Sequence, residues 1–204
     1  DYDALYLVLP TQALAKIGEI GVLISEQPID ADGARIHVWA WLFADETQTQ
    51  MKDFDAYVVH ETGHLLGLPD LYSTGSPRTF HLWDTMAFGT GSRAGGMFGW
   101  HRWKLGWLDA SQVACLNGRR SVTATVAPLE RPGGTKAIVF RGAKSAYVVE
   151  VRQRLAEDAA ICRTGVLIYR VLFDAPSGSA DAALLNASIA RWAPRSAMRR
   201  SAPR

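Results

Sequence analysis

The sequence predicts a mixed α/β (α+β) fold in which a domain of strands and helices is followed by a smaller β-rich region. Short apolar runs near the start have the length and composition of strands, and a later segment ending near Leu66 has helical spacing of its apolar residues. After residue 110, β-branched runs recur at short intervals. We therefore expect a first domain over 1–110, a β-rich subdomain over 111–176 and a disordered tail rich in Ala, Ser and Arg over 177–204.

The first domain begins with predicted strands over residues 4–9, 21–29 and 34–43. The turn formers of residues 30–33 join the second and third strands as a hairpin. The third strand is apolar on both faces, which is typical of a strand covered on both sides. A cap at Thr49 or Asp53 then starts the predicted helix.

Four β-branched runs separated by glycine-containing turns predict the second region. The runs cover residues 121–126, 137–140, 146–151 and 165–171. Their regular spacing favours a small β-sandwich-like subdomain packed on the first domain. Glu150 and Arg152 are interpreted as a structural pair within it.

Composition and charge exclude several classes of function. A 204-residue chain that is 48% hydrophobic can bury a substantial core. Residues 181–204 contribute +4 to the formal net charge of +2, so the preceding residues sum to −2 and a basic nucleic-acid face is not expected. No apolar run is long enough to span a membrane. The chain opens on Asp1 without a leader, and we interpret it as an excised fragment.

The stretch from His60 to Tyr72, HETGHLLGLPDLY, carries the chemistry. On a helix, His60 and His64 are one turn apart and share a face, where two neutral imidazoles can bind one zinc ion. Glu61 lies beside the first histidine, where a carboxylate can take a proton from zinc-bound water.

The residues after the second histidine predict a third ligand. Gly67 can end the helix in a left-handed conformation, and Pro69 prevents its continuation. Asp70 then arrives where a third ligand is needed. Two histidines and one carboxylate, with a position left open for water, form a catalytic rather than a structural zinc set.

These residues also resemble a known family. The stretch HETGHLLGLPDLY, the later Trp83-Asp84-Thr85-Met86 and the run WHRWKLGWL over 100–108 are similar to the immune inhibitor A family of secreted bacterial metallopeptidases. The similarity is close from about residue 54 to 110 and continues weakly to about 171. Snapalysin-type proteases share the motif that ends in aspartate and are a near neighbour.

The resemblance implies a metzincin-like, secreted zinc peptidase domain whose first strand and helix are missing from this fragment. It implies zinc bound by His60, His64 and Asp70, with Glu61 as base and Met86 in a turn beneath the metal. Phe88 stands where some metzincins have a tyrosine that assists the metal, and it cannot ligate. Calcium is a further implied cofactor, although no EF-hand-like run is present.

Several other residues have a functional interpretation and a structural alternative. His81, His101 and Tyr72 are candidates for the substrate rim, with packing inside the fold as the alternative. In a secreted protein, Cys115 and Cys162 would form one disulfide, and two reduced thiols are the alternative.

The predicted function is hydrolysis of peptide bonds in a protein or peptide substrate by a monomeric zinc endopeptidase, through a water activated by Glu61. One alternative is a zinc hydrolase that uses Asp84, which lies at the spacing of the third ligand in thermolysin-like enzymes; the helix stop at Gly67 favours Asp70. The other alternative is a secreted metal-binding or adhesion module without catalysis.

Overall fold

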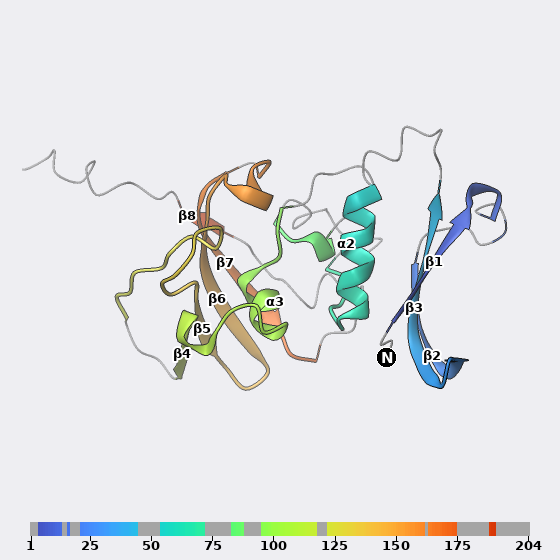
Figure 1. The fold of residues 1–204 in the computed structure, drawn as a ribbon. Coiled ribbons are helices and arrows are strands. Elements are labelled where there is room, and N and C mark those ends of the chain that lie inside the picture. The colour runs from blue at the N-terminus through green and yellow to red at the C-terminus, as the bar shows by residue number, and fades with distance from the viewer. Residues whose placement is uncertain are drawn as a thin grey trace, which may run out of the picture.

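A computed structural model shows a mixed α/β protein with two separate sheets and a few short helices. Helix α2 lies between the two sheets (Figure 1). The structure describes residues 4–13, 16, 21–44, 54–71, 83–87, 95–117, 122–161, 163–174 and 188–190.

The first sheet has three strands in the order β1-β3-β2. Strand β1 (Leu5–Pro10) is parallel to β3 (Ala34–Ala44), and β2 (Gly21–Ala31) is antiparallel to it. A short 3₁₀ turn, η1 (Thr11–Ala13), follows β1. Asp32 and Gly33 close the hairpin with φ angles of 49° and 80°, which is the conformation of a type I′ turn. The three predicted strands and the hairpin turn are confirmed.

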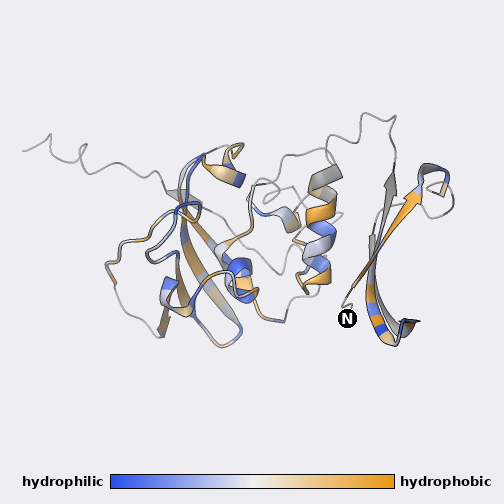
Figure 2. Cartoon of the chain, in the orientation of Figure 1, coloured by the Kyte–Doolittle hydropathy of each residue, from blue (hydrophilic) through white to orange (hydrophobic). Residues whose placement is uncertain are grey.

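The two faces of this sheet have different environments. Tyr6 and Ala40 are register partners on the face toward α2, where the hydroxyl of Tyr6 lies 2.7 Å from Oγ1 of Thr62. Leu7 and Trp41 are register partners on the other face, and Leu7 is 36% exposed. Figure 2 shows β1 as hydrophobic along its length. On β3, Ile36 and Ala40 share the face toward α2 and are buried, while Trp39 and Trp41 on the other face are partly buried. Strand β3, for which the sequence predicted cover on both faces, is therefore more deeply buried on the face toward α2.

Helix α2 (Phe54–Leu65) carries His60, Glu61 and His64 and contacts elements on both of its sides. It contacts β2 and β3 of the first sheet and the 3₁₀ turn η3 (Thr85–Ala87). Its predicted end near Leu66 is confirmed, and the predicted cap residues Thr49 and Asp53 lie outside the described residues. A second, shorter helix is α3 (Gly99–Lys104).

The second sheet is a single mixed sheet in the order β4-β5-β6-β7-β8, and among the described residues no second sheet packs on it as a sandwich. The pair β4–β5 is parallel and the other pairs are antiparallel. Turns η4 and η5 flank it. The bounds are β4 Val113–Asn117, β5 Ala137–Arg141, β6 Ser145–Arg152, β7 Gly165–Leu172, β8 Ser188–Ala190, η4 Ala110–Gln112 and η5 Ala156–Asp158.

Three of the four predicted strands of this region are confirmed, and the run over 121–126 is not a strand where the structure describes it. Val122 is 45% exposed there, so the β-branched side chains have no sheet face to pack against. The short strand β8 pairs with β7 inside the segment that was expected to be disordered. For those three residues the expectation was wrong, because the edge of β7 offers them backbone hydrogen bonds.

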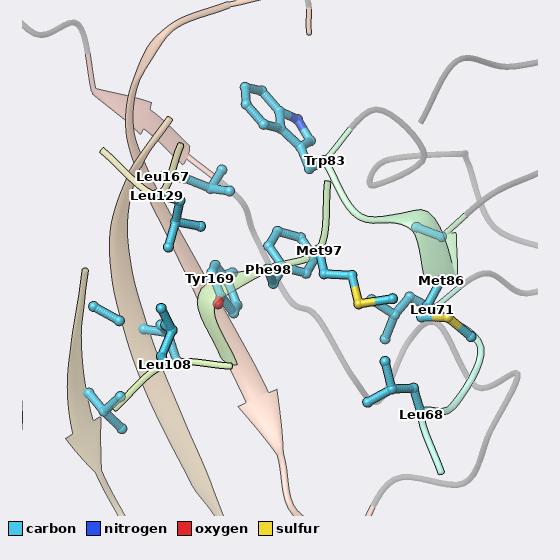
Figure 3. Close-up of a cluster of buried hydrophobic side chains, with 14 of the residues drawn as sticks. Leu68, Leu71, Trp83, Met86, Met97, Phe98, Leu108, Leu129, Leu167 and Tyr169 are labelled. Atoms are coloured by element: carbon cyan, nitrogen blue, oxygen red, sulfur yellow. The ribbon is translucent and has the colours of Figure 1, made fainter. Parts of the chain in front are cut away.

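One hydrophobic core crosses the predicted domain boundary at residue 110. Leu68, Leu71 and Met86 from the motif region belong to the same buried cluster as Val148 and Leu167 from the second sheet. In Figure 3 the side chain of Met97 extends from the sheet side of this cluster toward Leu71 and Met86. The residues that follow α2 are therefore held in place by packing on the second sheet.

The predicted disulfide is not formed, because Cys115 is a free thiol. Its side chain is exposed on β4, which is an edge strand of the second sheet among the described residues. Cys162 lies outside the described residues. In the described part of the chain, no helix has the length and apolar character needed to cross a membrane.

Candidate metal centre

The end of α2 is a Schellman motif, as the glycine stop predicted. The N–H of Leu68 donates to the carbonyl of Gly63 at 2.9 Å, and the N–H of Gly67 donates to the carbonyl of His64 at 2.9 Å. Gly67 has a φ angle of 82°, which a residue with a Cβ adopts only with strain. This reversal brings Asp70 back beside the helix face that carries both histidines.

The predicted ligands converge on one point. Oδ1 of Asp70 lies 3.2 Å from Nε2 of His60 and 3.0 Å from Nε2 of His64. The two imidazole rings are perpendicular, with centroids 4.8 Å apart. One ligand atom from each of these residues lies within 4.8 Å of the others, so the group could hold a metal ion.

Backbone carbonyls fix the orientation of both histidine rings. Nδ1 of His60 lies 2.9 Å from the carbonyl oxygen of Thr85, and Nδ1 of His64 lies 2.8 Å from that of Leu68. A carbonyl oxygen can only accept, so each Nδ1 carries the hydrogen and donates it. In a neutral ring, Nε2 then presents its lone pair toward Asp70. Metal-binding histidines in proteins are commonly held in this way.

The electrostatics of the group are those of a carboxylate between two imidazoles. Burial by itself would raise the pKa of Asp70, but hydrogen bonding with His60 and His64 outweighs burial and holds that pKa well below its usual range. Burial would lower the pKa of His64, but the hydrogen bonds with Asp70 and with the Leu68 carbonyl outweigh it, so this pKa is raised. The site therefore attracts a cation, either a proton or a metal ion.

Access to the site differs among the ligands. The side chain of His60 is 4% exposed, while those of His64 and Asp70 are 19% and 23% exposed. Glu61 is buried on the same helix, and its charge contributes to the raised pKa of His64. The carboxylate assigned as the base is thus electrostatically coupled to the site.

Met86 lies in turn η3 and is completely buried against α2. A Cβ atom at Gly63 would overlap its sulfur, so the absence of a side chain at Gly63 permits the approach. The carbonyl of Met86 accepts the N–H of Leu71 at 2.8 Å. Met86 thus packs against the middle of the helix that carries both histidines.

Two predicted roles are corrected by the contacts of Asp84 and His101. Oδ2 of Asp84 accepts hydrogen bonds from Nδ1 of His101 at 2.9 Å and from the N–H of Phe98 at 2.7 Å. Asp84 is fully buried and His101 is 4% exposed. Asp84 is therefore committed to a structural cluster and is not the third ligand, and His101 is not a residue of the substrate rim. The other rim candidates, Tyr72 and His81, lie outside the described residues, as does Phe88.

A buried cluster centred on Arg152 supports the loops behind the site. Its guanidinium donates to Asp158 at 2.5 and 2.6 Å, to Glu150 at 3.0 Å and to the carbonyl of Trp83 at 3.0 Å. Glu150 also accepts the N–H of Gly99 at 2.7 Å. The predicted structural pairing of Glu150 and Arg152 is confirmed, but its link to Trp83 was not visible in the sequence because the partner is a backbone atom.

The roles of Thr85 and Asp84 could not be predicted as readily as those of the histidines. Thr85 acts through its carbonyl group, which every residue possesses, so no side-chain signal marks it. Asp84 precedes a short turn, where aspartate commonly caps a helical turn, and this signal could have indicated its structural role.

Comparisons with known proteins do not assign the chain to a family. No family model matches it, and neither the curated proteins nor the solved structures include a match. The resemblance to the immune inhibitor A family therefore rests on the quoted motifs alone.

Proposed function

We propose that this chain is a secreted, zinc-dependent endopeptidase. The observation that supports the proposal most strongly is the convergence of three lone-pair-bearing atoms, from His60, His64 and Asp70, on one point. The histidines are each held by a carbonyl on the side away from that point. The proposals that the protein is secreted and that its substrate is a peptide rest on the motif resemblance.

The donor set fits zinc. Zinc ligands at 2.0–2.1 Å in tetrahedral geometry are about 3.3 Å apart. The distances from Oδ1 of Asp70 to the two Nε2 atoms, 3.2 and 3.0 Å, are close to that separation. Two imidazoles and one carboxylate leave the fourth tetrahedral position for water or substrate, which is the arrangement of catalytic zinc sites.

A zinc ion bound here would supply a Lewis acid that activates water and polarises the scissile carbonyl. The residues of the chain perform the remaining steps. Asp70 and His64 are the more exposed ligands, so a peptide would reach the metal from their side. Glu61 accepts the proton of the attacking water and returns it to the leaving amine, so the amine departs in its neutral form.

The experiment that tests this function compares wild type with Glu61→Gln. We expect wild type to bind one zinc ion and to cleave casein or a quenched fluorescent peptide until a chelator is added. Glu61→Gln should retain zinc and lose roughly 10²–10⁴-fold in turnover, the usual contribution of a general base. Glu157→Gln changes a partly exposed carboxylate on η5 and serves as the control with unchanged turnover.

Two outcomes would contradict parts of this proposal. Retained turnover in Glu61→Gln would exclude Glu61 as the base. Zinc binding by wild type without any hydrolysis would instead favour a non-catalytic metal-binding module.

A further inference from the structure

Asp84 is the point at which two segments of the chain, turn η3 and the start of α3, are joined. It is completely buried, and Oδ1 accepts the N–H of Met86 at 2.7 Å. Oδ2 accepts the N–H of Phe98 at 2.7 Å and the Nδ1–H of His101 at 2.9 Å. The carboxylate thus caps turn η3 with one oxygen and ties this turn to the start of α3 with the other.

Turn η3 also contacts the candidate metal centre, at three places. The carbonyl of Thr85 accepts the Nδ1–H of His60 at 2.9 Å. The side chain of Met86 fills the space at Gly63, between the two histidines of α2. The carbonyl of Met86 accepts the N–H of Leu71, the residue that follows Asp70, at 2.8 Å. Displacement of this turn would therefore move two of the three ligands relative to the third.

We infer that Asp84 is a positioning residue of the metal centre, acting through turn η3 rather than by contact with the metal. This inference rests on the proposed zinc site. The carboxylate is required because both of its oxygens accept backbone N–H groups. An asparagine has only one acceptor oxygen, so its amide nitrogen would face a buried N–H and repel it. The turn would shift, and the Thr85 carbonyl would no longer hold the ring of His60 in its ligating orientation.

Glu150 provides a matched control for Asp84. It is equally buried and also accepts a backbone N–H of α3, that of Gly99, at 2.7 Å. Its other partners are the hydroxyl of Tyr169 and the guanidinium of Arg152. Arg152 in turn donates to the carbonyl of Trp83, but among the described residues no hydrogen bond joins Glu150 itself to η3. Glu150→Gln should therefore lower stability as much as Asp84→Asn does, without moving the ligands.

The test measures zinc affinity by competition with a chromophoric chelator, together with the visible absorption spectrum of the Co²⁺-substituted protein. We expect Asp84→Asn to lose about 10–100-fold in zinc affinity, the usual cost of changing an outer partner of a metal ligand, and to show an altered Co²⁺ spectrum. Glu150→Gln should keep both the affinity and the spectrum of wild type. Circular dichroism checks that each variant is folded.

A second pair of variants keeps the test decisive if Asp84→Asn does not fold. His101→Ala removes one donor to Asp84 and should weaken zinc binding by a smaller factor. His101→Asn places an amide N–H where Nδ1 was and should restore the affinity. The inference is overturned if Asp84→Asn binds zinc as tightly as wild type, if Glu150→Gln weakens binding equally, or if His101→Ala and His101→Asn do not differ. Failure of wild type to bind zinc would overturn the proposed function as well.

Discussion

Gly63 lies so close to the sulfur of Met86 that a Cβ atom at this position would overlap it. Glycine in the middle of a helix costs about 1 kcal/mol relative to alanine, so helix propensity disfavours it here. The close approach offsets that cost, because it lets turn η3 pack directly beneath the helix that carries both histidines.

Gly63→Ala should therefore destabilise the protein, although alanine is the better helix former. Overpacking of a close core contact costs about 1–3 kcal/mol, which exceeds the gain in helix propensity. Chemical denaturation should show a net loss of stability. The double variant Gly63→Ala/Met86→Ala removes the overlapping atoms and should show that the two changes are not additive. A gain in stability for Gly63→Ala alone would contradict the contact.

Asp70→Ala should abolish tight zinc binding. It removes one of the three ligands, so its loss of affinity should exceed the 10–100-fold that is typical of changes in outer partners. Zinc content after dialysis and competition with a chelator measure the effect. Asp109→Asn, a change at an exposed carboxylate before η4, is the control and should leave affinity unchanged. Undiminished affinity of Asp70→Ala would remove Asp70 from the ligand set.

The metal-free protein should lose stability as pH rises through the pKa of His64. This pKa is raised in the folded state, so the stabilisation is fully present below the unfolded value of about 6.5 and is lost above the folded value. The pKa of Asp70 is lowered in the folded state, so the stabilisation that Asp70 contributes is lost only when the pH falls into the acid range. Thermal unfolding in chelator, from about pH 6 to pH 8, measures the fall.

Asp70→Asn removes the negative partner of His64, so the loss of stability with rising pH that this pair causes should be smaller in that variant. The zinc affinity of wild type should instead rise over the same pH range, because protons compete with zinc for the ligands at lower pH. Equal pH dependence in wild type and Asp70→Asn would contradict the pairing.

Glu130→Gln should stabilise the protein at alkaline pH. Burial and a hydrogen bond with Asp158 raise the pKa of Glu130 to about 7, so the folded state holds its proton between the unfolded pKa and that value. Stability therefore falls as pH rises through this window. A neutral glutamine avoids the loss, and its advantage over wild type should grow by on the order of 2 kcal/mol between about pH 5 and pH 8. An advantage that does not change with pH would exclude the shifted carboxyl.

Cys115 should react with a thiol reagent in the native protein without prior reduction, because its side chain is a free, exposed thiol. Mass spectrometry of the labelled protein would locate the adduct. Added reductant should leave the melting temperature unchanged. A fall in melting temperature on reduction would indicate the disulfide that the sequence suggested.

Local chemistry explains which features could be predicted from the sequence. The hairpin turn at Asp32-Gly33 and the helix stop at Gly67 require backbone conformations that few residues adopt, so these residues indicate the structure directly. The pairing of His60 with His64 follows from helical spacing. Asp70 could be predicted as their neighbour because a proline and a glycine constrain the short connection between them.

Other features depend on contacts between distant segments. The run over 121–126 has the composition of a strand but no partner, whereas β8 forms because the edge of β7 is available to it. Asp84 carries the same chemical groups as Asp70. Only tertiary packing distinguishes them, since it surrounds Asp84 with N–H donors from Met86, Phe98 and His101.

The sequence by itself determined the candidate ligand set, because His60, His64 and Asp70 lie within one helix and the turn that ends it. The tertiary structure alone decided what holds the set in place: the carbonyl of Thr85, the side chain of Met86 and the carboxylate of Asp84. Apart from the cap that Asp84 places on η3, these contacts join residues far apart in the chain, and several use backbone groups that every residue carries. No local pattern marks such partners, so only the folded chain identifies them.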